Sequence, residues 1–422
     1  MDSREIRNST PPKYCDCPLN DRANHLIKSP SFVAGNRYGN TFDTATHSLM
    51  LPTSMPTATP NNSTSISGSF GSDYQSLPHT PGLPPLFWPC VGEHPVYDGN
   101  LYNFLSADEM RNDLYRSGIG DTVAGKIVVD IGTGDQAHWA IECIRAGAKK
   151  AYAIEQNPKA AALAQELVSK LGLADRITVL VGRSTEINLP ELADVCISEI
   201  LGEIGSAEGA ITTLNDAKNR LMKTGGEFLP ERCNTFIAPV QLPTELITSP
   251  TFDPDALPYL NHIFAAARRP FDVRVSISNL GNSYKLPSIP TTFESLNFSG
   301  QIEQNSIHGH TFVISDTAEL HGFLLWLSIE CRIGAGQLDT LLHKTNWFPV
   351  FFPVWPNSLP VTEGDSIECA FSRHLSDDGM HPNYAIEGIV RSRAGNEQNF
   401  MWKSDHHSST FLASDFYKEL FA

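Results

Sequence analysis

The stretch KIVVDIGTG (residues 126–134) decides the fold of this 422-residue chain. Its β-branched first half predicts a buried strand, and the acid and two glycines that follow predict a tight turn where the backbone can approach a ligand closely. The next segment, QAHWAIECIRA (136–146), predicts a helix. The folded part of the chain is therefore expected to contain a strand, a glycine turn and a helix in this order.

The same alternation continues downstream of this unit. Further strands are predicted at 150–155, 176–182 and 194–200. Asn157 and Pro158 predict the start of an intervening helix, because Asn caps a helix N-terminus and Pro suits the first helical position. Strands that alternate with helices predict a parallel sheet covered on both faces. Segment 225–240 returns to β structure, and the short β-rich segments beyond it predict an antiparallel, barrel-like domain.

The beginning of the chain differs in composition from the rest. Residues 1–85 are rich in Ser, Thr, Pro and Asn and carry no apolar period, which predicts a disordered tail. Cys15 and Cys17 lie in this tail without a second pair of Cys or His residues at zinc-ligand spacing. We therefore expect no metal site.

The net charge of −16 indicates which partners the chain avoids. An acidic surface disfavours nucleic-acid backbones and anionic membranes, because both carry negative charge. The N-terminus lacks the apolar core of a secretory signal. The sequence contains no run of about 18 apolar residues, so we expect no membrane span. We expect an intracellular protein that is cytoplasmic, with a nuclear location left open.

The glycine turn is the candidate cofactor site. Gly132 and Gly134 follow the first predicted strand, and Glu155 ends the second strand 21 residues after Gly134. An acid at that strand end can bind both hydroxyls of a ribose. A structural turn in another α/β protein remains the alternative. A dinucleotide site is less favoured, because Gln136 and Ala137 do not continue the three-glycine spacing.

A second candidate site follows the fourth predicted strand. The segment SEILGEIGSAEG (198–209) leaves the carboxyl edge of the sheet, where open α/β sheets bind ligands. Glu199 and Glu208 are nine residues apart, and the glycines between them permit a hairpin-like loop. Two carboxylates that face one pocket can hold a planar guanidinium through paired hydrogen bonds. The alternative is that Glu203 and Glu208 are solvated acids at a helix start.

At these residues the chain resembles the protein arginine methyltransferase family, colinearly over about residues 95–400. DIGTG with Glu155 resembles the family's cofactor motifs, and SEILGEIGSAEG resembles its double-E loop with both acids at the family spacing. YNFLSADEMRNDLYRSGI (102–119) resembles its cofactor-covering N-terminal helix. LPERCNTFIAPV, HGFLLW and NWFPVFFPV resemble the bridge into its β-barrel and the barrel strands. The later segments are most similar to the branch that dimethylates arginine symmetrically.

The resemblance implies an α/β fold class with two domains. A Rossmann-like class I methyltransferase domain is expected at 86–238 to bind S-adenosylmethionine. An antiparallel β-barrel domain is expected at 239–422 to bind the acceptor and form a homodimer, with residues 250–275 as the candidate dimerisation arm.

The resemblance also implies roles for individual residues. Glu199 and Glu208 are the implied catalytic residues, which hold the guanidinium of an arginine-containing protein or peptide. The implied cofactor-binding residues are Tyr102, Arg111, Asp130, Gly132, Gly134, Glu155, Ser184 and Thr185. Among these, Arg111 is expected to hold the carboxylate of the methionine moiety, and Ser184 and Thr185 are expected to contact adenine.

Three positions depart from the family pattern. Gln136 stands where the family has a third glycine. Asn346 stands where the barrel loop usually has a His, so the usual contact between that His and an acid near Asp108 is expected to be lost. Leu105 stands at a position that shapes the acceptor pocket, where the two branches carry Phe or Met.

These departures leave two further functions open. One is methylation of a small molecule, such as an indole, on the same scaffold, because a nearby Glu can also stabilise a ring that becomes cationic. The other is a catalytically silent interaction module, which the Gln136 change would permit.

Overall fold

The computed structural model describes residues 83–422. Residues 1–82 of the predicted tail, which include Cys15 and Cys17, lie outside the described residues. None of the helices in the described part of the chain combines the length and the apolar composition that crossing a membrane requires.

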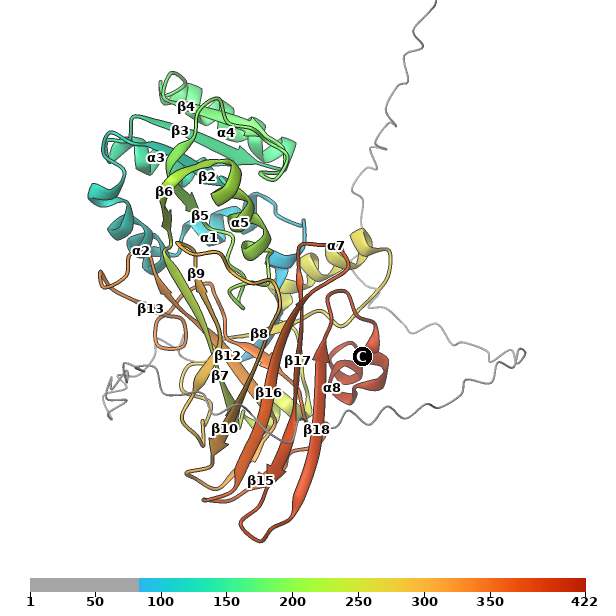
Figure 1. The fold of residues 1–422 in the computed structure, drawn as a ribbon. Helices are drawn as coiled ribbons and strands as arrows, with labels where there is room; N and C mark the ends of the chain where they lie inside the picture. Colours follow the sequence, from blue (N-terminus) through green and yellow to red (C-terminus); the bar gives the residue numbers. More distant parts are fainter. Residues whose placement is uncertain (1–82) are drawn as a thin grey trace, which may run out of the picture. The chain divides into compact units, whose positions relative to one another are not determined.

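A five-stranded parallel sheet carries the glycine turn (Figure 1). Its strand order is β4-β3-β2-β5-β6, formed by β4 (Ile177–Val181), β3 (Lys150–Glu155), β2 (Ile127–Ile131), β5 (Ala193–Ser198) and β6 (Met222–Leu229). The first four strands confirm the sequence prediction, and β6 adds a fifth strand parallel to β5. Central strand β2 is buried along its whole length, as a β-branched run between two helical layers requires.

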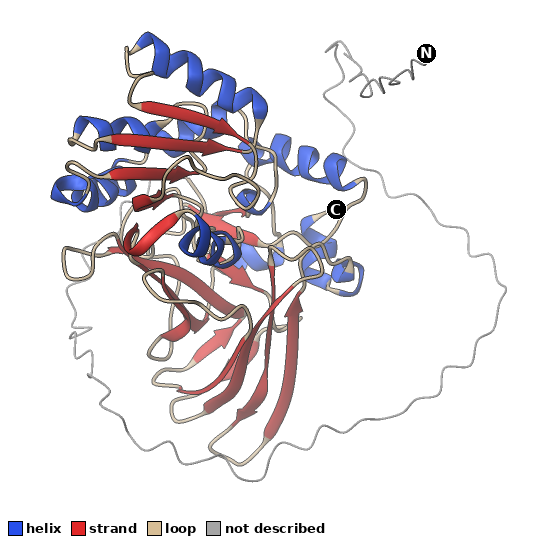
Figure 2. Cartoon of the chain, turned by 45° about the horizontal axis from the view of Figure 1, so that its top comes forward, coloured by secondary structure: helices blue, strands red, loops and turns tan. Residues whose placement is uncertain are grey.

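Helices cover this sheet (Figure 2). They are α1 (Gly99–Ser106), α2 (Glu109–Ile119), α3 (His138–Arg145), α4 (Pro158–Lys170) and α5 (Ala210–Arg220). Helix α4 begins where it was predicted: the Asn157 side chain accepts a hydrogen bond from the backbone N–H of Lys159 at 3.0 Å, and Pro158 is the first helical residue. α3 packs on β2 and β3, α4 packs on β3 and β4, and α5 packs on β6.

Antiparallel sheets form the second half of the chain, as predicted. The larger sheet has the order β1-β8-β14-β12-β7-β9, with β13 paired to β12. Its strands are β1 (Leu86–Pro89), β7 (Arg232–Val240), β8 (Val275–Ser278), β9 (Thr291–Asn297), β12 (Gly322–Glu330), β13 (Leu338–Asp339) and β14 (Val350–Phe352). The others are β10 (Ser306–Val313), β16 (Ser366–Leu375), β17 (Pro382–Arg391) and β18 (Glu397–Ser404) in one sheet, and β11 (Ala318–Leu320) with β15 (Leu359–Val361).

Strand β12 lies between two apolar cores of this barrel-like half. Leu324 and Trp326 point into one core, and Phe323 and Leu325 point into the other, because successive side chains of a strand face opposite sides. Short helices complete this half: η1 (Val91–Glu93), α6 (Thr244–Thr248), α7 (Leu257–Ala267) and α8 (Asp415–Leu420).

The chain passes between the two kinds of sheet earlier than the predicted domain boundary at 238/239. β6 ends at Leu229, and β7, which starts at Arg232, already pairs with β12 and β9. β1 also pairs with barrel strand β8, although it was assigned to the first domain. Both differences arise because strand pairing over long sequence distances decides the sheet, and local composition does not record it. The division into domains itself stays a prediction.

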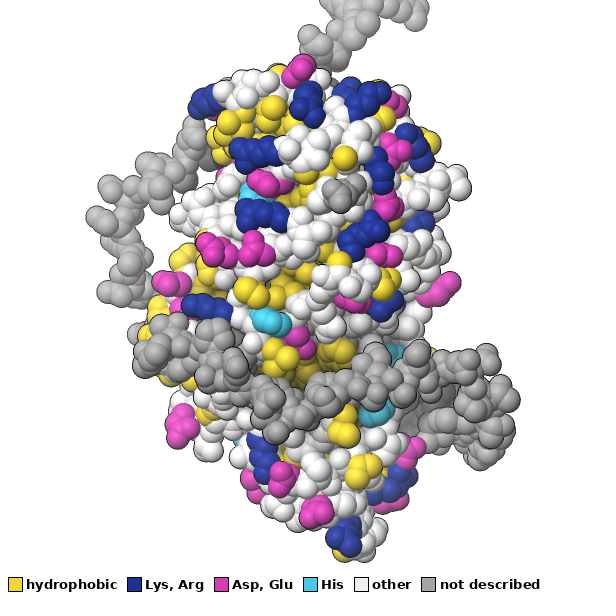
Figure 3. All heavy atoms as spheres, turned by 90° about the vertical axis from the view of Figure 1, so that its left-hand side faces the viewer, with side chains coloured by type: hydrophobic (Ala, Val, Ile, Leu, Met, Phe, Trp, Pro, Cys, Tyr) yellow, Lys and Arg dark blue, Asp and Glu magenta, His cyan; other side chains and the backbone are white. Residues whose placement is uncertain are grey.

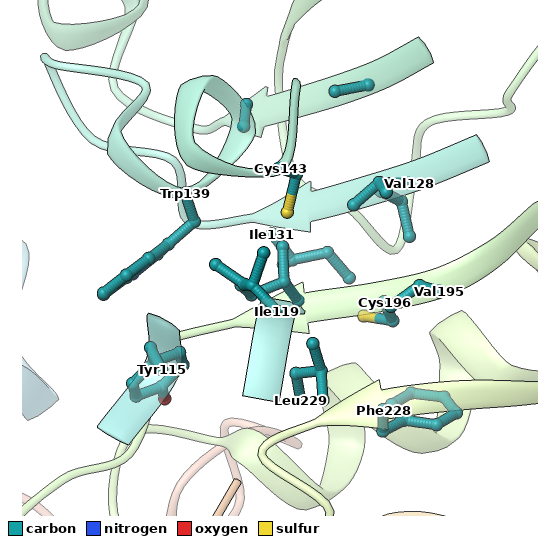
Figure 4. Close-up of a cluster of buried hydrophobic side chains, with 14 of the residues drawn as sticks. Tyr115, Ile119, Val128, Ile131, Trp139, Cys143, Val195, Cys196, Phe228 and Leu229 are labelled. Atoms are coloured by element: carbon teal, nitrogen blue, oxygen red, sulfur yellow. The ribbon is translucent and has the colours of Figure 1, made fainter. Parts of the chain in front are cut away.

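Helix α2 is fixed against the sheet by a buried aromatic contact (Figure 4). The ring of Tyr115 stacks on Trp139 of α3 with 4.6 Å between the ring centroids. The Tyr115 hydroxyl donates to the backbone oxygen of Ser198 at the end of β5, at 3.1 Å. This contact ties α2 to the strand end from which the two predicted catalytic acids follow.

We predict that Tyr115→Phe lowers the free energy of unfolding by about 1–2 kcal/mol, because it leaves a buried carbonyl oxygen without its donor. Urea denaturation measures the change. Tyr259→Phe is the matched control, since the Tyr259 hydroxyl donates at 3.4 Å to Asp98 on the exposed surface. Equal unfolding free energies in the two variants would contradict the anchoring role of Tyr115.

Candidate active site

The glycine turn has the backbone conformation that its sequence predicted. Gly132 and Gly134 have φ values of +78° and +68°, which side chains with a Cβ rarely adopt. A Cβ at Gly134 would stand 3.1 Å from the ring of Tyr102, which lies over the turn. Tyr102 of α1 therefore covers this turn closely.

Asp130 ties the turn to the following helix. Its side chain is fully buried, and Oδ2 accepts hydrogen bonds from the Thr133 hydroxyl at 2.5 Å and from the Ala140 N–H at 3.0 Å. Burial raises the pKa of Asp130 to about 7, against the lowering effect of the Thr133 bond. Within the described residues, Oδ1 of Asp130 has no hydrogen-bond partner.

Glu155 stands at the carboxyl end of β3, next to the turn. It is buried, and its Oε2 accepts from the N–H of Gly134 at 3.0 Å while Oε1 accepts from the N–H of Asn157 at 2.7 Å. Burial raises the pKa of this carboxyl group. The structure thus joins Glu155 to the glycine turn, and its contact with a ribose stays a prediction.

Arg111 contacts one of the two predicted catalytic acids directly. Its Nη1 donates to Glu199 Oε2 at 2.8 Å, and its Nη2 donates to the backbone oxygen of Leu105 at 2.6 Å. Both side chains of this pair are largely buried, with 6% of Arg111 and 14% of Glu199 exposed. The Arg111 Nε–H is buried and has no partner among the described residues. The sequence predicted the position of Arg111 near the cofactor but not this ion pair.

Glu199 and Glu208 line one cavity of about 40 Å³. Neither acid is solvated at a helix start: α5 begins only at Ala210, and Glu203, which was part of that alternative, is 8% exposed and lines the same cavity. The Tyr97 hydroxyl donates to Glu208 Oε2 at 3.3 Å. The loop 198–209 therefore brings three carboxyl groups to one place.

Burial and mutual repulsion shift these acids toward their protonated forms. Burial raises the pKa of Glu208 well above its usual range, and repulsion by Glu199, Glu203 and Glu93 raises it further. Burial also raises the pKa of Glu203, to about 8. Burial raises the pKa of Glu199 while the Arg111 guanidinium lowers it. A positive charge in this cavity would shift these carboxyl groups back toward their charged forms.

Aromatic side chains form the walls of this acidic cavity, and the sequence analysis did not find them. The lining includes Trp88, Tyr97, Phe104, Trp347 and Phe348. They come from β1, the segment between η1 and α1, α1 itself and the loop before β14, and only the fold brings them together. The one local signal was the aromatic segment NWFPVFFPV, of which Trp347 and Phe348 reach the site.

The barrel loop keeps its contact with α2 despite the Asn at position 346. The backbone N–H of Asn346 donates to Asp108 Oδ2 at 2.7 Å, and its side-chain amide donates to the backbone oxygen of Phe104. The side-chain pair with Asp108 is absent, as expected for Asn at this position, and the main chain supplies a different donor to the same carboxylate.

The remaining predicted cofactor residues lie beyond the third strand. Ser184 is buried and Thr185 is half-buried in the turn after β4. The backbone oxygen of Ser184 accepts from Arg220 at 2.7 Å, which ties this turn to α5. Their contact with adenine stays a prediction.

Comparison with known proteins agrees with this geometry. Residues 97–229 match the family model described as PRMT5 arginine-N-methyltransferase. Over 179 residues the chain is 31% identical to the probable protein arginine N-methyltransferase 6 of Arabidopsis thaliana. This aligned stretch covers 40% of each of the two chains. It is 33% identical over 146 residues to protein arginine N-methyltransferase 6 of Danio rerio, covering 34% of this chain and 41% of that protein. The matched part thus spans less than half the length of either relative.

The fold also matches solved structures. The crystal structure of protein arginine methyltransferase 10 from Arabidopsis thaliana superimposes with a TM-score of 0.60 at 20% identity, covering 73% of this chain and 98% of that one. The enzyme–prozyme complex of PRMT1 from Trypanosoma brucei, solved with AdoHcy, gives a TM-score of 0.57 at 16% identity.

The parallel sheet with its glycine turn, followed by antiparallel barrel sheets, defines a class I methyltransferase fold with an appended β-barrel. Over residues 97–229 the chain is similar to protein arginine methyltransferases, and its fold resembles that of their solved structures.

We predict that Glu203→Gln stabilises the chain at alkaline pH and has little effect at pH 5. The native protein holds a proton on Glu203 up to about pH 8, whereas the unfolded chain releases it near pH 4.5, so native stability falls as the pH rises between these values. The substitution removes this loss, which is on the order of 5 kcal/mol for a pKa that rises from 4.5 to about 8. Urea denaturation at pH 5 and pH 8.5 measures the unfolding free energy of the wild type and the variant. Glu186→Gln, at an exposed position, is the control. The same difference in unfolding free energy at both pH values would contradict the raised pKa of Glu203.

Proposed function

We propose that this chain is an S-adenosylmethionine-dependent methyltransferase that methylates a guanidinium nitrogen of an arginine-containing protein or peptide. The observation that carries the proposal is the convergence of Glu199, Glu203 and Glu208 on one aromatic-walled cavity next to the glycine turn. An uncompensated group of buried carboxyls is costly, and a bound cation removes that cost.

The residues around the glycine turn fit the cofactor. Gly132 and Gly134 keep the turn free of side chains of their own, and Tyr102 and Ile200 approach the backbone closely there. Glu155 ends β3 where a ribose would bind, and Arg111 offers a buried Nε–H without a partner to the carboxylate of a methionine moiety. When bound, S-adenosylmethionine supplies an electrophilic sulfonium methyl group.

The cavity itself favours a guanidinium as acceptor. Glu199 already binds a guanidinium, that of Arg111. An arginine side chain can stack on the aromatic walls while the acids accept its N–H groups.

The acids have two tasks in the proposed reaction. Glu199 and Glu208 fix the guanidinium so that one nitrogen faces the methyl carbon, which is mainly a gain in proximity and alignment. The new bond joins that nitrogen to the methyl carbon, the broken bond leaves its electron pair on sulfur, and one proton must leave the methylated nitrogen. Glu208, whose pKa is raised by burial, accepts that proton.

The partners follow from the same chemistry. An arginine-rich peptide complements the acidic cavity, and on the face that Figure 3 shows, basic and acidic side chains are interspersed. We propose a homodimer as the assembled form. Helix α7, within the expected arm, buries Leu260, Ile263 and Phe264 in its own chain, so only the opposite face of this helix remains for a second copy.

The acceptor is tested with labelled S-adenosylmethionine. We expect mass spectrometry to find a methyl group on arginine in an Arg-rich peptide and none on a panel of indoles and other metabolites. Glu199→Gln should lower kcat by at least about 100-fold, because it removes one charged orienting group. Label on an indole with unmodified peptide would establish the small-molecule function instead, and full activity of Glu199→Gln would end the proposed mechanism.

Cofactor binding is tested separately, by calorimetric titration with S-adenosylmethionine. We expect Glu155→Ala to raise Kd by about 10- to 100-fold through the loss of charged hydrogen bonds. Glu199→Gln should stay within a few-fold of the wild type, because it frees the Arg111 guanidinium without removing it. Absence of binding to the wild-type chain would establish the silent interaction module.

A further inference from the structure

A group of histidines that the proposed reaction does not use lies beside the acidic cavity. His94 follows η1, His381 lies between β16 and β17, and His406 and His407 follow β18. The ring centroids of His381 and His406 are 4.3 Å apart, and those of His406 and His407 are 4.0 Å apart. The cluster therefore joins three segments that are distant in the sequence.

Asp378, His381 and His406 present three potential metal ligands toward one another. One oxygen and two nitrogens of these side chains all lie within 4.8 Å of each other. Asp378 Oδ2 is 2.5 Å from His381 Nδ1 and 3.5 Å from His406 Nε2. Zinc bonds of about 2.1 Å in a tetrahedral site place neighbouring ligand atoms about 3.4 Å apart, so these separations require only small movements.

Hydrogen bonds already orient the Asp378 carboxylate. Asp378 Oδ1 accepts from the Ser376 hydroxyl at 2.7 Å and from the N–H groups of Met380 and His381 at 2.8 and 2.9 Å. These three donors fix the carboxylate and leave Oδ2 toward the two imidazoles.

His406 has the support that metal-bound histidines have. Its Nδ1 lies 3.4 Å from Oε2 of Glu93, which is buried and paired with Arg274, while its Nε2 faces Asp378. A carboxylate behind a ligating imidazole fixes the tautomer and the ring orientation. Only 7% of the His406 side chain is exposed, so its position is well defined by packing.

We propose that Asp378, His381 and His406 bind one divalent transition-metal ion of the zinc type. Two imidazole nitrogens and one carboxylate oxygen suit such an ion. The ring of His381 lies nearly parallel to that of His406, at 12°, and must turn as the ion enters; at 21% exposure this side chain has room to do so. A metal ion bound to His381 Nδ1 and Asp378 Oδ2 takes the place of the hydrogen bond between these two atoms.

The proposed metal site is connected to Glu208 through two packing contacts. The Met380 side chain packs on Gly209, within 2.6 Å of the position that a Cβ would take, and Gly209 follows Glu208. Gly92, which precedes Glu93, packs directly against the Glu208 carboxyl group. Both segments that contact this region continue into the metal cluster, so the ion stiffens the wall of the cavity. Its binding does not depend on the proposed transfer reaction.

The test is zinc affinity of the untagged, chelator-stripped full chain, measured in competition with a chromophoric zinc chelator. We expect one zinc equivalent to be lost, or its affinity to fall by at least tenfold, in His406→Ala and in Asp378→Asn. His374→Ala is the matched control, because His374 is exposed on β16 of the same hairpin and lies outside the cluster. This control should keep the affinity of the wild type.

A second variant guards against simple misfolding. His381→Gln replaces the partly exposed ligand, and circular dichroism should show an intact fold. Zinc should raise the thermal unfolding midpoint of the wild type and of His374→Ala, and should leave that of His381→Gln unchanged. No saturable zinc binding by the wild type, or equal affinity and equal thermal shift in wild type and folded His381→Gln, would overturn the proposed site.

Discussion

The constraint on which the site depends is the burial of acidic charge at the carboxyl edge of the parallel sheet. Glu199, Glu203 and Glu208 line one small cavity, and the nearby carboxylate of Glu93 also repels the Glu208 carboxylate. Of these, Glu199 is paired with Arg111 and Glu93 with Arg274, while burial raises the pKa of both Glu203 and Glu208. Buried acids without a cationic partner are costly unless they are protonated, and the guanidinium of the proposed acceptor would supply the positive charge that Glu203 and Glu208 lack.

Arg111 connects this cavity to the cofactor side of the sheet. Its guanidinium spans Glu199 and the backbone of Leu105, and α2, which carries it, is held in place by Tyr115. The same side chain is thus close to both halves of the proposed reaction. A ligand carboxylate that engages Arg111 would weaken its hold on Glu199 and leave that acid more available to an acceptor.

The sequence predicted the features whose causes are local. The parallel strands, the cap of α4, the glycine turn and the acids of the 198–209 loop all follow from short patterns with a direct physical reason. What it did not predict depends on contacts between distant segments. β1 joins the barrel by pairing with β8, the aromatic walls come from four separate segments, and Glu203 looks solvated until the loop around it is buried. Asn346 shows the same limit, because its backbone makes a contact that no side-chain pattern records.

The histidine cluster also depends on contacts between segments that are distant in the sequence. His94 and His406 are separated by 312 positions, so no ligand spacing in the sequence reveals them, yet η1, the β16–β17 turn and the segment after β18 bring them together. The acidic cavity and the cluster share two short connections, Gly92–Glu93 on one side and Gly209 against Met380 on the other. Met380 reaches Gly209 with its flexible side chain, whereas the main chain at Gly92 packs against the Glu208 carboxyl group, so the Gly92–Glu93 connection is the more rigid of the two. The closest structural link between the acidic cavity and the histidine cluster is therefore Glu93, which faces His406 while its neighbour Gly92 contacts Glu208.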